Sequence, residues 1–435
     1  MSIQRQFNVA TLALLGTVCA TLAHGQAQPF SPSGPLSLRQ ALDAARNNVD
    51  VSLARSAAEA AKADVLAADH APPPSFSAKL SSIDLENGTG EGSVLSERRI
   101  DKGIGIDWTW ERGNKRELRT QTAQLSASAA VADVEETQIQ QMLAVSSAFF
   151  DLAAAQERVT LVEHIAASTG QIANTAARRL TAGDLARQDA LRLEIEAERA
   201  KGDLAAAVLD ERRSALALAS LLGLSGSQSL HAQTEWLPTQ EPQTDIATSD
   251  FALQAVVDGR ADIRAAADRA AAAEAALHGA TAQKKADITW GVSLDHFPGT
   301  SSKLLELRMQ MPLQFGYRFQ GETGRANAQL AAARSTLDKV RHIAVLELQG
   351  LRAQLLNTAE RSQRYRKNIM PRAQQVASQA ELGYQKGALP LSDLLDARRI
   401  LRATGLEALA AQADHAKAAT AWRLRTQSPA ALLSE

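Results

Sequence analysis

Four short segments of the chain alternate apolar and polar residues, which predicts β-strands with one apolar face. In the second of them Ile104, Ile106, Trp108 and Trp110 share one face, with Asp107 and other polar or small residues on the opposite face. Segments with the same period of two lie at about residues 75–81, 103–111, 287–297 and 304–315.

Long Ala-rich stretches with helical periodicity fill most of the remaining chain. Ser37 is placed to cap the first helix, and the prolines that begin at Pro72 end it near His70. The expected helices cover about residues 37–70, 115–180, 183–222, 251–282, 321–382 and 391–425.

The pattern of helix, strand, strand and helix occurs twice. Val49-Asp50-Val51 aligns with Ala261-Asp262-Ile263, Gly113 with Gly316, and Gly183 with Gly387. The spacing differs only between the strands, where the first loop is longer, as expected for a surface loop. We therefore divide the chain into 26–249 (first repeat with a connector), 250–426 (second repeat) and a tail at 427–435.

Alternating strands with charges on one face are typical of a membrane barrel with a water-filled lumen. A soluble sheet packed on helices shows the same alternation and is the alternative. Four strands cannot close a barrel, and open edges are not tolerated in lipid. Two chains would give eight strands, which leave no open channel, whereas three chains give twelve, which can.

The expected fold is therefore mainly α with a transmembrane β-barrel: a trimeric, twelve-stranded barrel with four strands per chain, on a long α-helical tube that projects from the membrane, which the resemblance described below implies is a periplasmic tunnel. A helix over residues 115–180 would be about 100 Å long. A simple coiled-coil rod is the other structure that such a helix permits.

The N-terminus has the features of a secretory signal peptide over residues 1–25. Arg5 supplies the charge, residues 9–20 the apolar stretch, and small residues around Gly25 the cleavage site. Cys19 is the one cysteine of the chain and Thr17-Val18 before it do not fit a lipoprotein signal, so we expect neither lipidation nor a disulfide. No later apolar run is long enough for a transmembrane helix.

Charge and motif content exclude other classes. The net charge of −1, from 47 basic and 48 acidic residues, indicates no nucleic-acid partner. No nucleophile–base constellation or phosphate-binding loop is present, so we expect no enzyme and no cofactor. The eight histidines show no paired spacing, so we expect no dedicated metal site.

Two strand-to-helix junctions, residues 110–116 (Trp-Glu-Arg-Gly-Asn-Lys-Arg) and 311–318 (Met-Pro-Leu-Gln-Phe-Gly-Tyr-Arg), resemble those of the outer-membrane efflux protein (TolC-like) family. Residues 153–158 (Ala-Ala-Ala-Gln-Glu-Arg) are most similar to the heavy-metal (CzcC-like) branch. The resemblance covers nearly the whole mature chain. It implies a homotrimer in outer-membrane lipid with its helices in the periplasm, which docks on a periplasmic adaptor (membrane fusion) protein and an inner-membrane proton-driven efflux pump.

The resemblance further implies a passive exit duct for heavy-metal cations. Within the same fold, a duct for drugs or for type I protein secretion is the alternative. From other classes, a non-channel structural coiled-coil envelope protein and a periplasmic adaptor are possible in principle, although an adaptor should have one hairpin and several small β domains.

Each repeat also has a helix break at a glycine followed by an aspartate: Gly183 with Asp189, and Gly387 with Asp393. The resemblance implies that these breaks form the periplasmic tip and, with Leu389, dock the adaptor. Leu389 stands where drug-efflux members have an arginine that helps to lock the tip.

Tyr384, Asp393 and Asp396 match the closing residues of those members. The two aspartates are three residues apart, so they share one helix face. Threefold symmetry would gather six carboxylates into a cation-attracting ring. A solvated helix face without such a role is the alternative.

Overall fold

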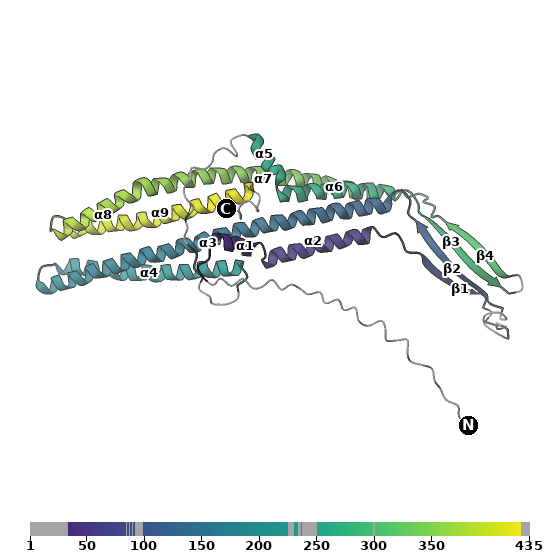
Figure 1. Ribbon diagram of the computed structural model, residues 1–435, viewed down its shortest axis with the longest axis horizontal. Helices are drawn as coiled ribbons and strands as arrows, with labels where there is room; N and C mark the ends of the chain where they lie inside the picture. Colours follow the sequence, from purple (N-terminus) through teal and green to yellow (C-terminus); the bar gives the residue numbers. More distant parts are fainter. Residues whose placement is uncertain are drawn as a thin grey trace, which may run out of the picture.

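The computed structural model describes residues 34–427 except 84, 87, 89, 92–98, 225–229, 234–235, 237–249 and 299–300. The expected signal peptide and most of the expected tail lie outside these residues. Figure 1 shows a long bundle of helices with a four-stranded sheet projecting from one end. The elements of the first half are α1 (Leu38–Ala45), α2 (Val49–Ala68), β1 (Ser75–Ser81), β2 (Asp101–Trp110), α3 (Lys115–Ala182) and α4 (Arg187–Leu221).

The second half has the same order of elements. They are α5 (Asp250–Gly259), α6 (Ala261–Ala282), β3 (Ile288–Phe297), β4 (Ser301–Gln310), α7 (Gln320–Arg364), a π-helical turn (Tyr365–Ile369), α8 (Met370–Gln385) and α9 (Leu391–Thr426). Each half has two helices before its pair of strands and two long helical segments after it. The first long segment is α3 in the first half and α7 with α8 in the second.

Helix α3 has 68 residues, so it is about 100 Å long and runs the length of the bundle. Helices α7 and α8 form the equivalent rod in the second half (Figure 1). Near the sheet these rods pack against α2 and α6, and toward the other end against α4 and α9. The turns between α3 and α4 and between α8 and α9 lie together at the end far from the sheet, which we call the tip (Figure 1).

The expectation of one continuous first helix in each half is wrong, because each is divided in two. Asn48 has an extended backbone and its side chain accepts a hydrogen bond from Val51 N at 3.1 Å, so it caps the new helix α2. Arg260 is the corresponding extended residue before α6. The capping role expected of Ser37 is confirmed, with a capping box formed by Gln40.

Strand β4 also differs from its expected span. It begins at Ser301 and ends at Gln310, so Met311, Leu313 and Phe315 lie beyond it. Pro312 explains the end, because proline donates no ladder hydrogen bond and restricts the residue before it. The expected single helix over 321–382 is interrupted by the π-helical turn, an irregularity that periodicity does not show.

The four strands form one antiparallel sheet in the order β1-β2-β3-β4. Pairing of β2 with β3 joins the two halves, with Ile106 opposite Val292 and Trp108 opposite Trp290. Strands β1 and β4 are the two edges of the sheet, so each presents a row of backbone groups that no described strand pairs.

Candidate functional site

One face of the sheet, which we call the apolar sheet face, is covered with large hydrophobic side chains. Phe76, Ile106, Val292 and Leu307 follow one another across all four strands as register partners. Phe76 is 71% exposed and Leu307 is 75% exposed. The exposed members are Phe76, Leu80, Ile104, Ile106, Trp108, Trp110, Trp290, Val292, Leu294, Leu305, Leu307 and Met309.

No helix lies over this face, because the sheet projects beyond the bundle (Figure 1). A soluble sheet would bury such a surface against another layer. The alternative of a sheet packed on helices is therefore wrong for the described part of the chain, and the alternation predicted from the sequence is confirmed. A continuous exposed apolar band of this kind marks a contact with lipid or with another protein.

The opposite, polar sheet face carries a cross-strand network of charged and hydroxyl groups. Arg308 donates to Asp107 at 2.5 Å and lies 3.7 Å from Glu306. Ser77 donates to the same Asp107 carboxylate at 3.4 Å. This face can therefore line an aqueous space, because it carries charged and hydroxyl groups where the opposite face carries large apolar side chains.

Glycines on the polar face make room for its carboxylates. Gly291 is the register partner of Asp107, and a Cβ atom at Gly291 would lie 2.2 Å from Asp107 Oδ1. Gly103 stands in the same relation to Asp295, at 2.1 Å. The sequence alone did not reveal this pairing, although glycine inside an alternating strand is a signal of close approach.

The duplicated junction motif turns the chain from strand into helix. Gly113 and Gly316 both have left-handed backbones, with φ of 80° and 81°. Lys115, at the start of α3, has a side chain only 7% exposed and binds Asp287 at 2.8 Å. Asp287 also accepts from Arg112 N at 2.9 Å, so the first junction is bonded to the start of β3.

A second ion pair lies at the first junction. Arg119 of α3 binds Glu111, the residue after β2, at 3.0 Å. This hydrogen bond raises the pKa of the Arg119 guanidinium.

Residues 153–158 lie within α3 and bind the connector that follows α4. Gln156 lies 3.0 Å from His231 Nδ1 and accepts from Ala232 N at 3.2 Å. Trp236 donates to Glu157 at 2.5 Å. Leu36 pairs with Ala232 in a parallel bridge. Residues 153–158 therefore hold the connector in place, and through the connector they also hold the start of the described chain.

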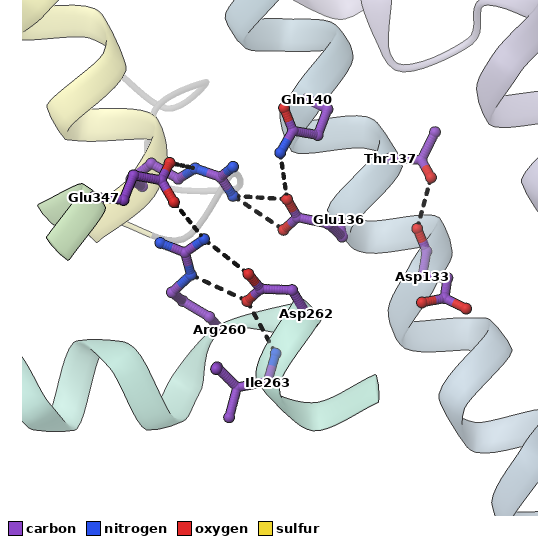
Figure 2. A network of polar contacts seen from close by, with 9 residues as sticks. Asp133, Glu136, Thr137, Gln140, Arg260, Asp262, Ile263 and Glu347 are labelled. Atoms are coloured by element: carbon purple, nitrogen blue, oxygen red, sulfur yellow. Dashed lines mark hydrogen bonds and ion pairs between the residues drawn. The ribbon is translucent and has the colours of Figure 1, made fainter. Parts of the chain in front are cut away.

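A network of charged side chains around two buried arginines joins the two halves of the chain at the middle of the bundle. We call Arg260, Asp262, Glu347, Arg425 and Glu136 the waist network. Figure 2 shows Arg260 between Asp262 of α6 and Glu347 of α7, with hydrogen bonds of 2.8 Å to each. Arg425 of α9 binds Glu347 at 2.9 Å and both carboxylate oxygens of Glu136 of α3 at 2.9 and 3.0 Å.

Both arginines of the waist network are almost fully buried, with side chains 6% and 4% exposed. Burial acts to lower the pKa of Arg260, but its bonds to Asp262 and Glu347 outweigh burial and raise it. The network was not predicted from the sequence, because its members come from four separate helices.

At the tip, the structure brings the expected residues of the second half together. Tyr384 is half-buried against an apolar cluster that includes Leu391 and Leu394, and its hydroxyl has no hydrogen-bond partner within the described chain. Asp393 accepts from Ser392 at 3.1 Å. Asp396 is exposed and pairs with Arg399 at 3.4 Å.

Leu389 packs on Gly383, where a Cβ atom would lie 2.6 Å from Leu389 Cδ1. The residue that replaces the family's arginine therefore makes an apolar contact within its own turn.

The first half contributes the other turn of the tip. Gly183 and Gly387 both end helices with left-handed backbones, at φ of 83° and 72°. Asp189 lies 4.0 Å from Arg192, the residue that corresponds to Asp396 in the second half. The paired aspartates therefore occur in the second half alone. The roles expected for Tyr384, Asp393, Asp396 and the two turns stay predictions.

Within the described residues, no group of three or more His, Cys, Asp or Glu side chains could hold a metal ion. Among the helices of this part of the chain, none combines the length and the apolar character needed to cross a membrane.

The sequence comparisons agree with the geometry. Residues 41–224 match the model of the family described as outer membrane efflux protein. The chain is 25% identical over 377 residues to the cobalt-zinc-cadmium resistance protein CzcC of Cupriavidus metallidurans. The aligned residues make up 86% of this chain and 85% of the relative. The resemblance to outer membrane efflux proteins, with a CzcC-like relative, is therefore confirmed.

Solved structures show the same fold. A membrane protein from Pseudomonas aeruginosa matches with a TM-score of 0.76 and 19% identity over 90% of each chain. Structures of CusC match with a TM-score of 0.76 and 17% identity over 92% of this chain and 96% of theirs. The open state of the MtrE outer membrane channel of Neisseria gonorrhoeae matches with a TM-score of 0.72 and 18% identity over 89% and 88%.

Proposed function

We propose that this relative of outer membrane efflux proteins is the outer-membrane channel subunit of a tripartite efflux system, and that it acts as a passive exit duct without catalysis. The observation that carries the proposal is the exposed apolar face of a four-stranded sheet with two open edges. Lipid is the medium in which such a face is stable, and the roughly 100 Å helical bundle then extends into the periplasm.

The open edges support a homotrimer. In lipid each edge strand has to be paired. If β4 of one chain pairs with β1 of the next, three chains close a barrel of twelve strands, with the apolar sheet face outward and the polar sheet face inward. The tips of three chains would then meet at the periplasmic end, where a periplasmic adaptor protein and an inner-membrane proton-driven pump would supply the substrate.

Heavy-metal cations are the substrate class that we propose. The relative named for cobalt, zinc and cadmium resistance supports it. The alternative is a duct for drugs or for type I protein secretion, because in a passive duct the pump selects the substrate.

A deletion strain tests the substrate class. We expect deletion to sensitise the cells to cobalt, zinc or cadmium salts, and plasmid-borne expression of this chain to restore growth. Hydrophobic drugs serve as the matched challenge and should change little. Sensitivity to drugs with unchanged metal tolerance would contradict the metal assignment while leaving the duct itself intact.

We further propose that Asp393 and Asp396 form a cation-binding ring at the tip. Six carboxylates around one axis attract divalent cations, although the Arg399 partner of Asp396 weakens the field. Replacing both by asparagine should raise the divalent-cation concentration that half-blocks single-channel current by about tenfold, equal to about 1.4 kcal/mol.

Asp189→Asn is the control for this ring, because it removes an aspartate from the other turn of the tip. Its block should change less than threefold. Unchanged block and cation selectivity in the Asp393→Asn, Asp396→Asn double variant would show that these residues are only a solvated helix face.

A further inference from the structure

The two strand-to-helix junctions share a motif but not their surroundings. We call residues 110–116 the first junction and residues 311–318 the second junction. At the first junction, a Cβ atom at Gly113 would lie 3.3 Å from Lys285 Cβ. At the second junction, a Cβ atom at the corresponding Gly316 would meet no described atom within 4 Å beyond its chain neighbours. The second junction therefore lacks the cover that the first one has.

The segment between α6 and β3 supplies the cover of the first junction. Its last residue, Asp287, accepts from Arg112 N at 2.9 Å and binds Lys115 at 2.8 Å, so the Lys115 side chain is only 7% exposed. The strand order explains this contact, because the end of β2 lies beside the start of β3, with Trp110 opposite Ile288. Within the chain, a junction after one strand is thus covered by the segment that precedes the neighbouring strand.

The second junction presents large apolar side chains on a fixed backbone. Leu313, Phe315 and Tyr317 are 65%, 85% and 50% exposed. Between the first two, Gln314 donates to Gln283 O at 3.1 Å, which ties the segment to the end of α6. An exposed apolar patch that is held in place in this way marks a contact surface.

A second exposed segment has the chemistry to cover this patch. Residues 71–74 (Ala-Pro-Pro-Pro) stand directly before β1, carry no charge and are all exposed. We call them the proline segment. Proline has no N–H group and its ring fixes φ, so three prolines in succession hold the backbone extended at little further cost in entropy. Pro-rich extended segments commonly dock on surfaces that present aromatic side chains.

The direction of the strands decides which chain brings the proline segment to the second junction. The end of β4 at Gln310 and the start of β1 at Ser75 both lie at the end of the sheet next to the bundle (Figure 1). Within one chain they are at opposite edges of the sheet. If β4 pairs antiparallel with β1 of the next chain, residues that follow β4 lie beside residues that precede that β1.

We propose that the second junction is the docking surface for the proline segment of the next copy of this chain, with proline rings packed on Leu313 and Phe315. The contact repeats between chains what the first junction and the segment before β3 do within one chain. This inference rests on the proposed function, because it requires β4 of one chain to pair with β1 of the next. It adds a contact outside the barrel that fixes which edges meet.

Cross-linking of paired cysteines in the outer-membrane fraction tests the proposal. The one native cysteine, Cys19, lies in the expected signal peptide. In Phe315→Cys with Pro73→Cys, a short bismaleimide should convert monomers into covalent dimers and trimers on denaturing gels. Labelling of Phe315→Cys alone by a water-soluble maleimide should be slowed on the order of tenfold in the trimer, because the thiol reacts only when the contact opens.

Two further pairs serve as controls. Arg112→Cys with Lys285→Cys occupies the equivalent places at the first junction, so its cross-link should form within one chain and leave a monomer that carries one bridging linker by mass. Phe315→Cys with Leu85→Cys places the second thiol beyond the far end of β1, at a side chain that is 93% exposed, and should give no product between chains.

The mass of the unmodified assembly is measured in the same preparations. A trimer in which the Phe315→Cys, Pro73→Cys pair gives no product between chains, or no more than the Leu85→Cys pair, overturns the contact and leaves the duct intact. Slow labelling without a cross-link overturns it as well and assigns the second junction to lipid. Absence of any trimer overturns the proposed function together with this inference.

Discussion

Leu307→Arg is expected to abolish assembly of the protein in the outer membrane. Leu307 is 75% exposed on β4, with Val292 as its register partner and Leu305 and Met309 beside it on the same face. An arginine on the lipid face near the middle of the bilayer costs about 2–4 kcal/mol, and a trimer would contain three copies. The measurement is the amount of heat-resistant oligomer in the outer-membrane fraction, which should fall below one tenth of the unmodified level.

Glu306→Arg provides the control at the neighbouring position. It introduces the same side chain at nearly the same depth but on the polar sheet face, where Glu306 is one partner of Arg308 at 3.7 Å. Loss of this exposed ion pair costs less than about 1 kcal/mol, so the oligomer should persist. If the two variants behave alike, the assignment of the two faces to lipid and water is wrong.

Arg425→Met is expected to cause the largest loss of stability in the helical bundle. The side chain is 4% exposed and is shared between Glu136 and Glu347. Its removal takes a partner from two partly buried carboxylates, whose side chains are 18% and 31% exposed. Breaking a buried ion pair on one side costs about 3–5 kcal/mol. The free energy of unfolding, followed by the helical circular dichroism signal in denaturant, should fall by this amount.

Two comparisons separate this effect from ordinary loss of charge. Arg361→Met removes an exposed partner of Asp414, at 3.4 Å, and should cost less than about 1 kcal/mol. Combining Arg425→Met with Glu136→Gln should recover part of the loss, because it removes the carboxylate that has lost its charged partner, whereas Glu347 keeps its bond to Arg260 at 2.8 Å. An Arg425→Met variant as stable as Arg361→Met would show that the waist network does not hold the halves together.

Features encoded by neighbouring residues could be predicted from the sequence. The alternation around Ile106 and Leu307 is a local property of each strand, and the structure confirms it across all four. The left-handed turns at Gly183 and Gly387 follow from the special backbone freedom of glycine. The end of β4 was missed although Pro312 marks it, because apolar alternation continues past the proline.

Features that depend on distant residues could not be predicted. Nothing near Arg425 indicates that Glu136 is its partner, and nothing near Arg260 indicates that its side chain binds Glu347 of another helix. The tip residues are a different case. Asp393 and Asp396 were placed correctly on one helix, but a ring requires other chains, so their role remains a proposal.

Planar-bilayer recording of the purified protein, with its mass measured in the same preparation, tests the central claim most directly. The account predicts discrete ion-conducting steps from a particle of three chains, and loss of both the trimer and the current in Leu307→Arg. A membrane-bound single chain, or a stable trimer that inserts without passing current, would contradict it.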